Sequence, residues 1–215
     1  MPMSSLVPEK AFIFRIVHAD CVPWILDHGL HCRTSPTKDP NYIDIGSASL
    51  IQRRAHKQVP IAPGGVLSDY VPFYFTPYSI MMYNIHTGYG GITRRENKDI
   101  VIFVSSLHRV HQAGLPFVFT NQHAYAAGTE FFNDLAQLSE IDWPLLQSRN
   151  FKTDDADPGK QLRYQAEALI HHQLPLAALL GVGCHNNAVR LHLESLIAAR
   201  GLTLKVQTVP LWYFR

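Results

Sequence analysis

Short apolar runs separated by polar, turn-rich stretches dominate the chain, and this pattern is typical of many short strands with a few helices between them. The expected strands are residues 12–17, 71–76, 100–105, 117–120, 176–182 and 202–209. Few of the connections have the length of a regular crossover between parallel strands. The pattern therefore predicts an α+β fold with largely antiparallel sheets.

Apolar positions at helical spacing predict several helices between these strands. The expected helices are residues 20–30, 48–57, 79–86, 105–114, 130–138, 143–146 and 186–200. Start and stop signals support some of them, because Pro23 falls in a first turn, Ser47 can cap the second helix and Gly201 follows the last. Residues 31–46 lack any periodic pattern, and a loop of that length is often functional.

One carboxylate, Glu167, interrupts the apolar and strand-like run RYQAEALI at residues 163–170. A buried carboxylate is costly unless another group pairs with it or a reaction uses it. Periodicity alone also allows Glu167 to begin a helix and face solvent. Arg53 and Arg54, in the stretch LIQRR, carry the side chain best suited to a carboxylate or a pyrophosphate, which favours a functional pair.

Composition limits the classes of protein that fit. The 215 residues are enough for one domain, residues 1–215, and 47% of them are hydrophobic. No apolar run approaches a membrane span and the N-terminus lacks a secretory signal, so we expect a cytoplasmic protein with no membrane partner. The three cysteines lack a paired spacing, so no disulfide framework or zinc site is expected.

The formal net charge is only +2, so the protein has no broad positive electrostatic potential that would attract polyanions. Any contact with nucleic acid must therefore be local. Arginines interleaved with aromatic residues are typical of single-strand binders, although most of them fit a solvated surface equally well. These arginines are Arg53, Arg94, Arg95 and Arg149.

Two further features have a structural and a functional interpretation. Tyr74 alternates with Phe73 and Phe75 along a strand, so it either packs in the core or stacks on a planar ring from the other face. His108 and His111 share one face of a predicted helix, but no carboxylate has a matching spacing, so no metal is expected.

The chain resembles the DarT family of DNA ADP-ribosyltransferase toxins, in its thymidine-modifying branch. The resemblance runs through nearly the whole chain in ordered stretches. These are RIVHADCVPWILDHGLHC, LIQRRAHKQVPIAPGGVLSDYVPFYFTPYSIMMYNIHTG, AGLPFVFTNQHAY, IDWPLLQSRNF and RYQAEALI.

The resemblance implies an ADP-ribosyltransferase fold, in which two packed and mostly antiparallel sheets hold NAD in a cleft between them. It implies transfer of ADP-ribose from NAD to N3 of thymine in single-stranded DNA, without a metal, by a toxin that blocks replication. It also implies a macrodomain antitoxin of the DarG kind as partner, and we expect the enzyme to be a monomer.

The resemblance assigns roles residue by residue. The catalytic residues would be Arg54, Glu167 and His123. The NAD-binding residues would be Arg15, His18, Gly29, Arg54 and Tyr74. The residues that contact DNA would be Tyr74, Met81, His123, Arg53 and Arg149. Arg15, Cys21 and Ser68 differ from the residues common in relatives. We expect these differences to change the affinity for NAD or DNA and to leave the pair of Arg54 and Glu167 intact.

Three alternatives stay open at this point. The acceptor could be guanine, RNA or protein, because the arginine and the glutamate act on NAD while loops select the acceptor. The chain could also be a module that binds NAD or nucleic acid without catalysis. A metal-dependent nuclease using His108 and His111 would need no NAD.

Overall fold

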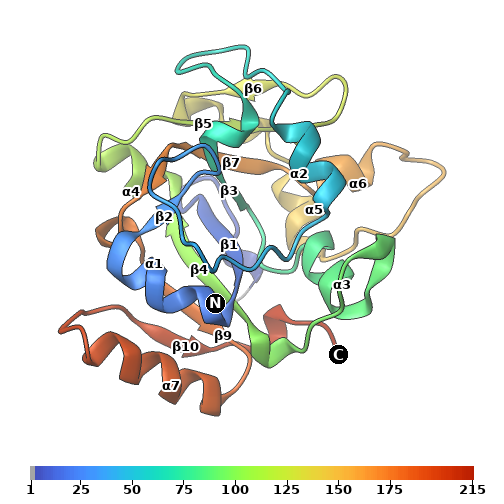
Figure 1. Ribbon diagram of the computed structural model, residues 1–215. Coiled ribbons are helices and arrows are strands. Elements are labelled where there is room, and N and C mark those ends of the chain that lie inside the picture. The colour runs from blue at the N-terminus through green and yellow to red at the C-terminus, as the bar shows by residue number, and fades with distance from the viewer. Residues whose placement is uncertain (1–2) are drawn as a thin grey trace.

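The computed structural model describes residues 3–215. Its strands are β1 (Phe12–His18), β2 (Leu30–His31), β3 (Tyr70–Tyr74), β4 (Ile100–Ser106), β5 (Phe117–Thr120), β6 (Phe131–Phe132), β7 (Glu167–His171), β8 (Gln173–Leu174), β9 (Gly181–Cys184) and β10 (Val206–Thr208). They form an eight-stranded sheet in the order β10-β9-β4-β1-β3-β7-β5-β6 and a two-stranded sheet of β2 and β8. The large sheet runs from β10 near the bottom of Figure 1 to β6 near its top.

The large sheet consists of two halves that meet between β1 and β3. Strands β1 and β4 pair along their whole length, whereas β1 and β3 share the single registered pair Phe14 and Tyr74. Only β9 and β10 run parallel to each other, and the other neighbours are antiparallel. The predicted α+β class with mostly antiparallel strands is confirmed. In place of two separate large sheets, one continuous sheet narrows to a single registered pair at Tyr74.

The helices lie around the sheet. They are α1 (Val22–His28), α2 (Ala48–Arg54), α3 (Ile80–Thr87), α4 (Leu107–Gln112), α5 (Trp143–Ser148), α6 (Lys160–Arg163) and α7 (Asn187–Ala198). Helices α2 and α3 lie on the right of Figure 1, α4 lies on the left, and α7 runs beside β10 at the bottom. Side chains cap several N-termini, as Ser47 does by accepting the N–H of Leu50, so the start of α2 follows from its sequence.

Two predicted elements are wrong. Residues 130–138 form β6 and then a 3₁₀ helix, Leu135–Glu140, instead of an α-helix. Phe132 stacks on Phe119 across the strand pair, and the side chain of Asp134 accepts the N–H of Ala136. Residues 176–182 are not one strand, because a 3₁₀ helix follows Pro175 and β9 begins only at Gly181.

Several predicted boundaries also differ. The strand predicted at residues 202–209 is only Val206–Thr208, and most predicted helices are shorter than expected. Helix α2 ends at Arg54 rather than Lys57. The run 163–170 is a strand only from Glu167 onwards, because Arg163 ends helix α6. Glu167 is therefore the first residue of its strand, and its backbone N–H donates to the side-chain hydroxyl of Thr120, the last residue of the neighbouring strand β5.

One large hydrophobic cluster contains buried residues from both halves of the sheet, from Leu6 to Tyr213. Every residue of β4 is buried, which explains its continuous apolar run. Phe14 of β1 meets Trp212 edge to face, with ring centroids 5.3 Å apart, so the C-terminal segment packs against the centre of the sheet. No helix within residues 3–215 is long and apolar enough to cross a bilayer.

Candidate active site

Glu167 lies where the two halves of the sheet meet. Its registered partner across β3 and β7 is Tyr74, the same residue that joins β3 to β1. Direct partners on antiparallel strands direct their side chains to the same face. Glu167 and Tyr74 therefore project together, although they lie far apart in the sequence.

Arg54 binds Glu167 through both carboxylate oxygens. Its Nη1 donates to Oε1 at 3.2 Å and to Oε2 at 2.9 Å. The backbone N–H of Ala124 adds a third bond, to Oε1 at 3.0 Å. The side chain of Glu167 is 3% exposed and that of Arg54 is 13% exposed, so this is a buried ion pair. The pairing of a guanidinium with this carboxylate, favoured by the sequence, is present in the structure.

The pKa of Glu167 reflects opposing influences. Burial alone would raise the pKa, because it disfavours the charged carboxylate. The guanidinium of Arg54 opposes burial, the N–H of Ala124 acts in the same direction, and a protonated His123 would do so too. The net result is a pKa below the usual value for glutamate, so Glu167 is an anion at neutral pH.

His123 lies beside this pair in a fixed orientation. Its Nδ1 accepts the backbone N–H of Tyr125 at 3.1 Å, while the distance from Nδ1 to Oε1 of Glu167 is 3.9 Å. The hydroxyl of Thr129 donates to the carbonyl of His123 at 2.9 Å and steadies the loop. Because Nδ1 is an acceptor, a neutral His123 ring carries its proton on Nε2.

Tyr74 and Met81 form a less polar wall next to Glu167. The Tyr74 hydroxyl lies 3.7 Å from the sulfur of Met81. Burial, followed by the negative charge of Glu167, raises the pKa of Tyr74 well above its ordinary value. Tyr74 therefore stays protonated and uncharged, and its ring can lie against another ring without a charge to solvate.

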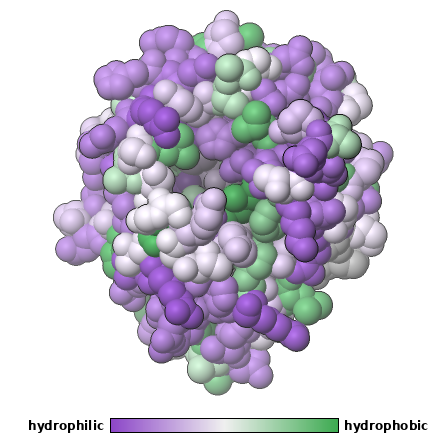
Figure 2. All heavy atoms as spheres, turned by 90° about the vertical axis from the view of Figure 1, so that its right-hand side faces the viewer, coloured by the Kyte–Doolittle hydropathy of each residue, from purple (hydrophilic) through white to green (hydrophobic). Residues whose placement is uncertain are grey.

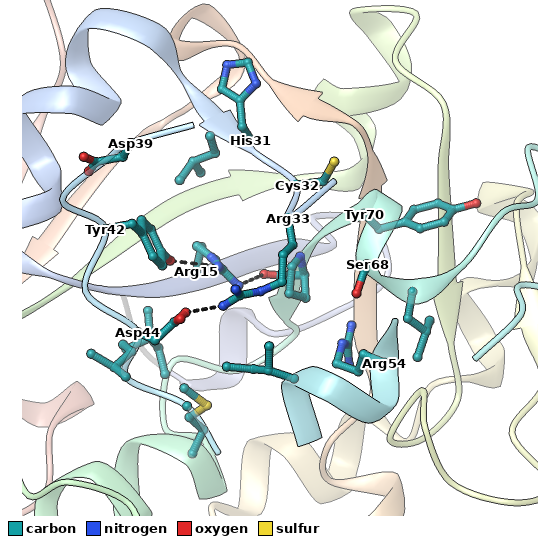
Figure 3. Close-up of a pocket in the computed structure, with 18 of the residues that line it drawn as sticks. Arg15, His31, Cys32, Arg33, Asp39, Tyr42, Asp44, Arg54, Ser68 and Tyr70 are labelled. Carbon is teal, nitrogen blue, oxygen red and sulfur yellow. Dashed lines mark hydrogen bonds and ion pairs between the residues drawn. The ribbon is translucent and has the colours of Figure 1, made fainter. Parts of the chain in front are cut away.

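These side chains line a cavity of about 350 Å³, whose other wall includes β1, β2 and residues 37–47. Figure 3 shows Arg15, Tyr42 and Asp44 around this cavity. Arg15 donates to the carbonyl of Pro72 at 3.1 Å and to the hydroxyl of Tyr42 at 3.1 Å. Arg33 forms an ion pair with Asp44 at 2.5 Å. Residues 37–47 are therefore held by two contacts, one at Tyr42 and one at Asp44.

Two buried donors in this cavity lack partners. Nε of Arg15 and Nη2 of Arg54 are buried and make no hydrogen bond within residues 3–215. An unpaired buried guanidinium nitrogen is unfavourable, so both atoms fit a ligand rich in phosphate or hydroxyl oxygens. A cavity of about 300–1,000 Å³ is usual for such ligands. The residues present therefore fit NAD.

Gly29 belongs to the same wall for a steric reason. Its φ of +82° is unfavourable for other residues, and a Cβ there would lie 2.8 Å from the carbonyl oxygen of Leu174. Glycine is therefore required here by the close approach of β8, and Gly29 also lines the cavity.

Some predicted site residues lie away from the cavity wall. His18 is 7% exposed, and its Nδ1 accepts the N–H of Asp20 at 3.2 Å. Arg53 is exposed, and its guanidinium lies 5.0 Å from the ring centre of Tyr125. Arg149 lies over the ring of Tyr78 at 3.7 Å and donates to a backbone carbonyl, that of Leu211.

His108 and His111, the two histidines considered as metal ligands, make structural contacts instead. Nε2 of His108 bonds the carbonyl of Pro8 at 2.8 Å, and His111 meets Phe117 edge to face. Within residues 3–215 no group of three histidine, cysteine or acidic side chains could hold a metal ion.

Sequence reasoning missed the residues that hold 37–47 in place. Tyr42, Arg33 and Asp44 carry no motif, and the only signal was the length of the loop. Cys21 also contributes here, because its sulfur accepts the N–H of Ile43 at 3.3 Å, whereas Ser68 is buried in the cavity wall.

Comparisons with known proteins bear on this site. A family model described as "ssDNA thymidine ADP-ribosyltransferase, DarT" matches residues 14–214. A "DNA ADP-ribosyl transferase" of Escherichia coli O127:H6 (strain E2348/69 / EPEC) is 52% identical over 211 residues, which are 98% of this chain and 97% of that protein.

The fold matches two solved structures of one bacterial protein. Thermus sp. 2.9 DarT in complex with ADP-ribosylated ssDNA matches with a TM-score of 0.87 and 31% identity, over 96% of this chain and 98% of that one. Thermus sp. 2.9 DarT in complex with NAD+ matches with a TM-score of 0.82 and 31% identity, over 96% and 99%.

Proposed function

The chain belongs to the DarT family of ssDNA thymidine ADP-ribosyltransferases, and from this premise we propose which side chains carry out the transfer. It is an NAD-dependent enzyme that transfers ADP-ribose to thymidine in single-stranded DNA, with NAD as a substrate. The observation that carries the residue assignment is the buried pair of Glu167 and Arg54 in a cavity with unpartnered guanidinium donors.

Glu167 stabilises the sugar during the transfer. The bond between the nicotinamide nitrogen and the ribose carbon breaks while a bond from that carbon to the thymine nitrogen forms, so positive charge develops on the sugar. A fixed carboxylate anion nearby favours that charge, and its orientation has been set in advance by Arg54 and by the N–H of Ala124. Nη2 of Arg54 remains as a donor toward NAD.

The thymine proton must leave N3 as the new bond forms. Glu167 is ionised and has free lone pairs, so we assign it as the proton acceptor. A carboxylate suffices, because N3–H becomes more acidic as N3 bonds to carbon. His123 presents Nε2–H and acts as a donor to a thymine carbonyl oxygen, where negative charge collects.

The remaining assignments concern binding. Arg15 and the Gly29 backbone contact NAD, whereas Tyr74 and Met81 contact the thymine ring. Arg53 is exposed next to the loop of His123 and fits a phosphate of the strand.

Two sequence-based assignments receive less support. The contacts of His18 favour a role in capping the turn after β1. The contacts of Arg149 favour a role in holding the C-terminal segment.

The biological setting follows from the family alone. We propose that the modification blocks replication in the cytoplasm and makes this chain the toxin of a pair. A DarG-like macrodomain protein would remove the mark. The large hydrophobic cluster, which runs from Leu6 to Tyr213, supports our proposal of one domain over residues 1–215. We also propose that the enzyme acts as a monomer.

Mass spectrometry of a thymine-containing single-stranded oligonucleotide with NAD and purified protein tests the assignment. We expect a gain of one ADP-ribose unit, lost with Glu167→Ala and lost when thymine is replaced. Modification of a thymine-free strand would overturn the acceptor. Full turnover by Glu167→Ala would overturn the role of Glu167.

A further inference from the structure

A second hollow lies beyond the NAD cavity, at the far end of α3. This basic pocket has a volume of about 640 Å³, and its lining includes three cations, Arg94, Arg95 and Lys98, one carboxylate, Glu96, and the two histidines His86 and His185. The side of the molecule that carries α3 faces the viewer in Figure 2, where hydrophilic residues dominate. None of the catalytic roles assigned above uses this pocket.

The charges of the basic pocket are unbalanced. Lys98 is paired with Glu96 at 2.8 Å. Arg94 and Arg95 have no carboxylate within ion-pair distance in the described part of the chain. In addition, Nε of Arg95 is buried there without a hydrogen-bond partner. The charge of Arg94 helps to lower the pKa of Glu96, but the carboxylate of Glu96 is bound to Lys98. Two guanidinium groups without an ion pair, one of them with an unused donor, fit a phosphate group, which they can bind through two parallel hydrogen bonds.

Exposed aromatic rings accompany these charges. Tyr83 of α3 is 37% exposed and Tyr89, just after the helix, is 68% exposed. Their ring centroids are 6.5 Å apart. Neither ring lines the pocket itself, but Tyr89 follows Gly88, where a Cβ would lie 3.6 Å from Cβ of Arg94. Exposed tyrosines near arginines are typical of surfaces that bind single strands, where bases stack on rings and phosphates meet cations. A free phosphate would leave the two rings unused.

Helix α3 connects the basic pocket to the site of the reaction. Met81, in its first turn, lines the NAD cavity, and His86, in its last turn, lines the basic pocket. Since a helix rises about 1.5 Å per residue, the two sites lie within roughly 10 to 20 Å of each other. A strand whose thymine occupies the cavity can therefore reach the pocket with a neighbouring part of its backbone.

We propose that the basic pocket binds the phosphate backbone of the same DNA strand, several nucleotides from the reacting thymine. The enzyme then binds long single strands more tightly than short ones, while the chemistry at Glu167 stays the same. This proposal depends on the proposed function in one respect only, namely that the strand is DNA.

The test compares two thymine-containing oligonucleotides, of about 4 and about 16 nucleotides, the range of strand lengths that single-strand sites cover. We expect Arg94→Gln/Arg95→Gln to raise KM for the long strand roughly tenfold and to leave the short strand and KM for NAD unchanged. The slope of log KM against log salt should fall by about 1.4, since each single-strand phosphate contact contributes about 0.7.

A matched control removes two exposed cations elsewhere. Lys10→Gln/Arg109→Gln changes the net charge equally, and α4, which carries Arg109, lies on the opposite side from α3 (Figure 1). This control should leave the long-strand KM within about twofold of wild type.

A single variant keeps the test decisive if the double variant folds poorly. Arg94 is exposed, so Arg94→Glu should fold normally and still raise the long-strand KM alone. An unchanged KM and salt slope in Arg94→Glu would overturn the proposal. Failure of the wild-type enzyme to modify either strand would instead overturn the assigned acceptor.

Discussion

Two arginine–carboxylate pairs line the same cavity and differ mainly in burial. The side chains of Arg54 and Glu167 are 13% and 3% exposed, whereas those of Arg33 and Asp44 are both 48% exposed. The buried pair acts in a poorly screened environment, where one uncompensated charge is expensive. The exposed pair is screened by water and salt and contributes little energy. Similar residue chemistry therefore suits the catalytic role proposed for the buried pair, and only the placement of residues 37–47 for the exposed pair.

Removing the buried guanidinium should have the largest effect. Arg54→Met takes away the main partner of Glu167 and the donor left for NAD, so kcat/KM should fall by at least about 100-fold. Breaking a buried pair also costs roughly 3–5 kcal/mol of stability while the carboxylate stays charged. Steady-state transfer to an oligonucleotide and thermal unfolding at neutral pH measure both effects.

The same variant should reverse a pH dependence. In the wild type the pKa of Glu167 is lowered, so its contribution to stability is present at neutral pH and lost as pH falls through that pKa. In Arg54→Met burial dominates and the pKa rises, so the contribution is present at low pH and lost as pH increases. Between pH 5 and 8 the wild-type contribution is therefore constant, so Glu167 should add no slope to the Tm of the wild type, whereas the Tm of Arg54→Met should fall as pH rises. Arg53→Met, which removes the exposed neighbour, should keep the wild-type slope, and an unchanged slope in Arg54→Met would contradict the account.

His123 should have the next largest effect, and two variants separate its possible roles. As a donor through Nε2–H, it can be partly replaced by an amide, so His123→Gln should keep at least about tenfold more kcat than His123→Ala. As a general base it could not be replaced by glutamine. Equal losses of kcat in the two variants would therefore favour the base role over the one assigned here.

The smallest effects should come from the exposed pair. Asp44→Asn removes the charge that pairs with Arg33 but keeps the shape, so KM for NAD should change by less than about fivefold with kcat unchanged. Raising the salt concentration should shrink this difference further. A loss of kcat approaching that of Arg54→Met would mean that residues 37–47 take part in the chemistry and not only in binding.

The sequence predicted the buried pair of Glu167 and Arg54 better than the contacts made by residues 37–47. Glu167 stood out because a carboxylate in an apolar run needs a partner, and Arg54 was the matching cation. Tyr42 and Asp44 lie in a polar loop, where nothing in the local pattern tells which side chains turn inward. Ala124 acts through its backbone N–H, which every residue other than proline possesses, so its sequence carries no signal.

The sequence by itself determined the α+β class, most strands and helices, the caps such as Ser47 and the family. Local spacing and turn chemistry are enough for these features. Only the tertiary structure decided that Tyr74 faces Glu167 and that Arg54 is buried while Arg53 is exposed. It also decided that Arg94 and Arg95 form no ion pair within residues 3–215. Strand register and burial depend on contacts between residues distant in the chain, and they determine which charges water can screen.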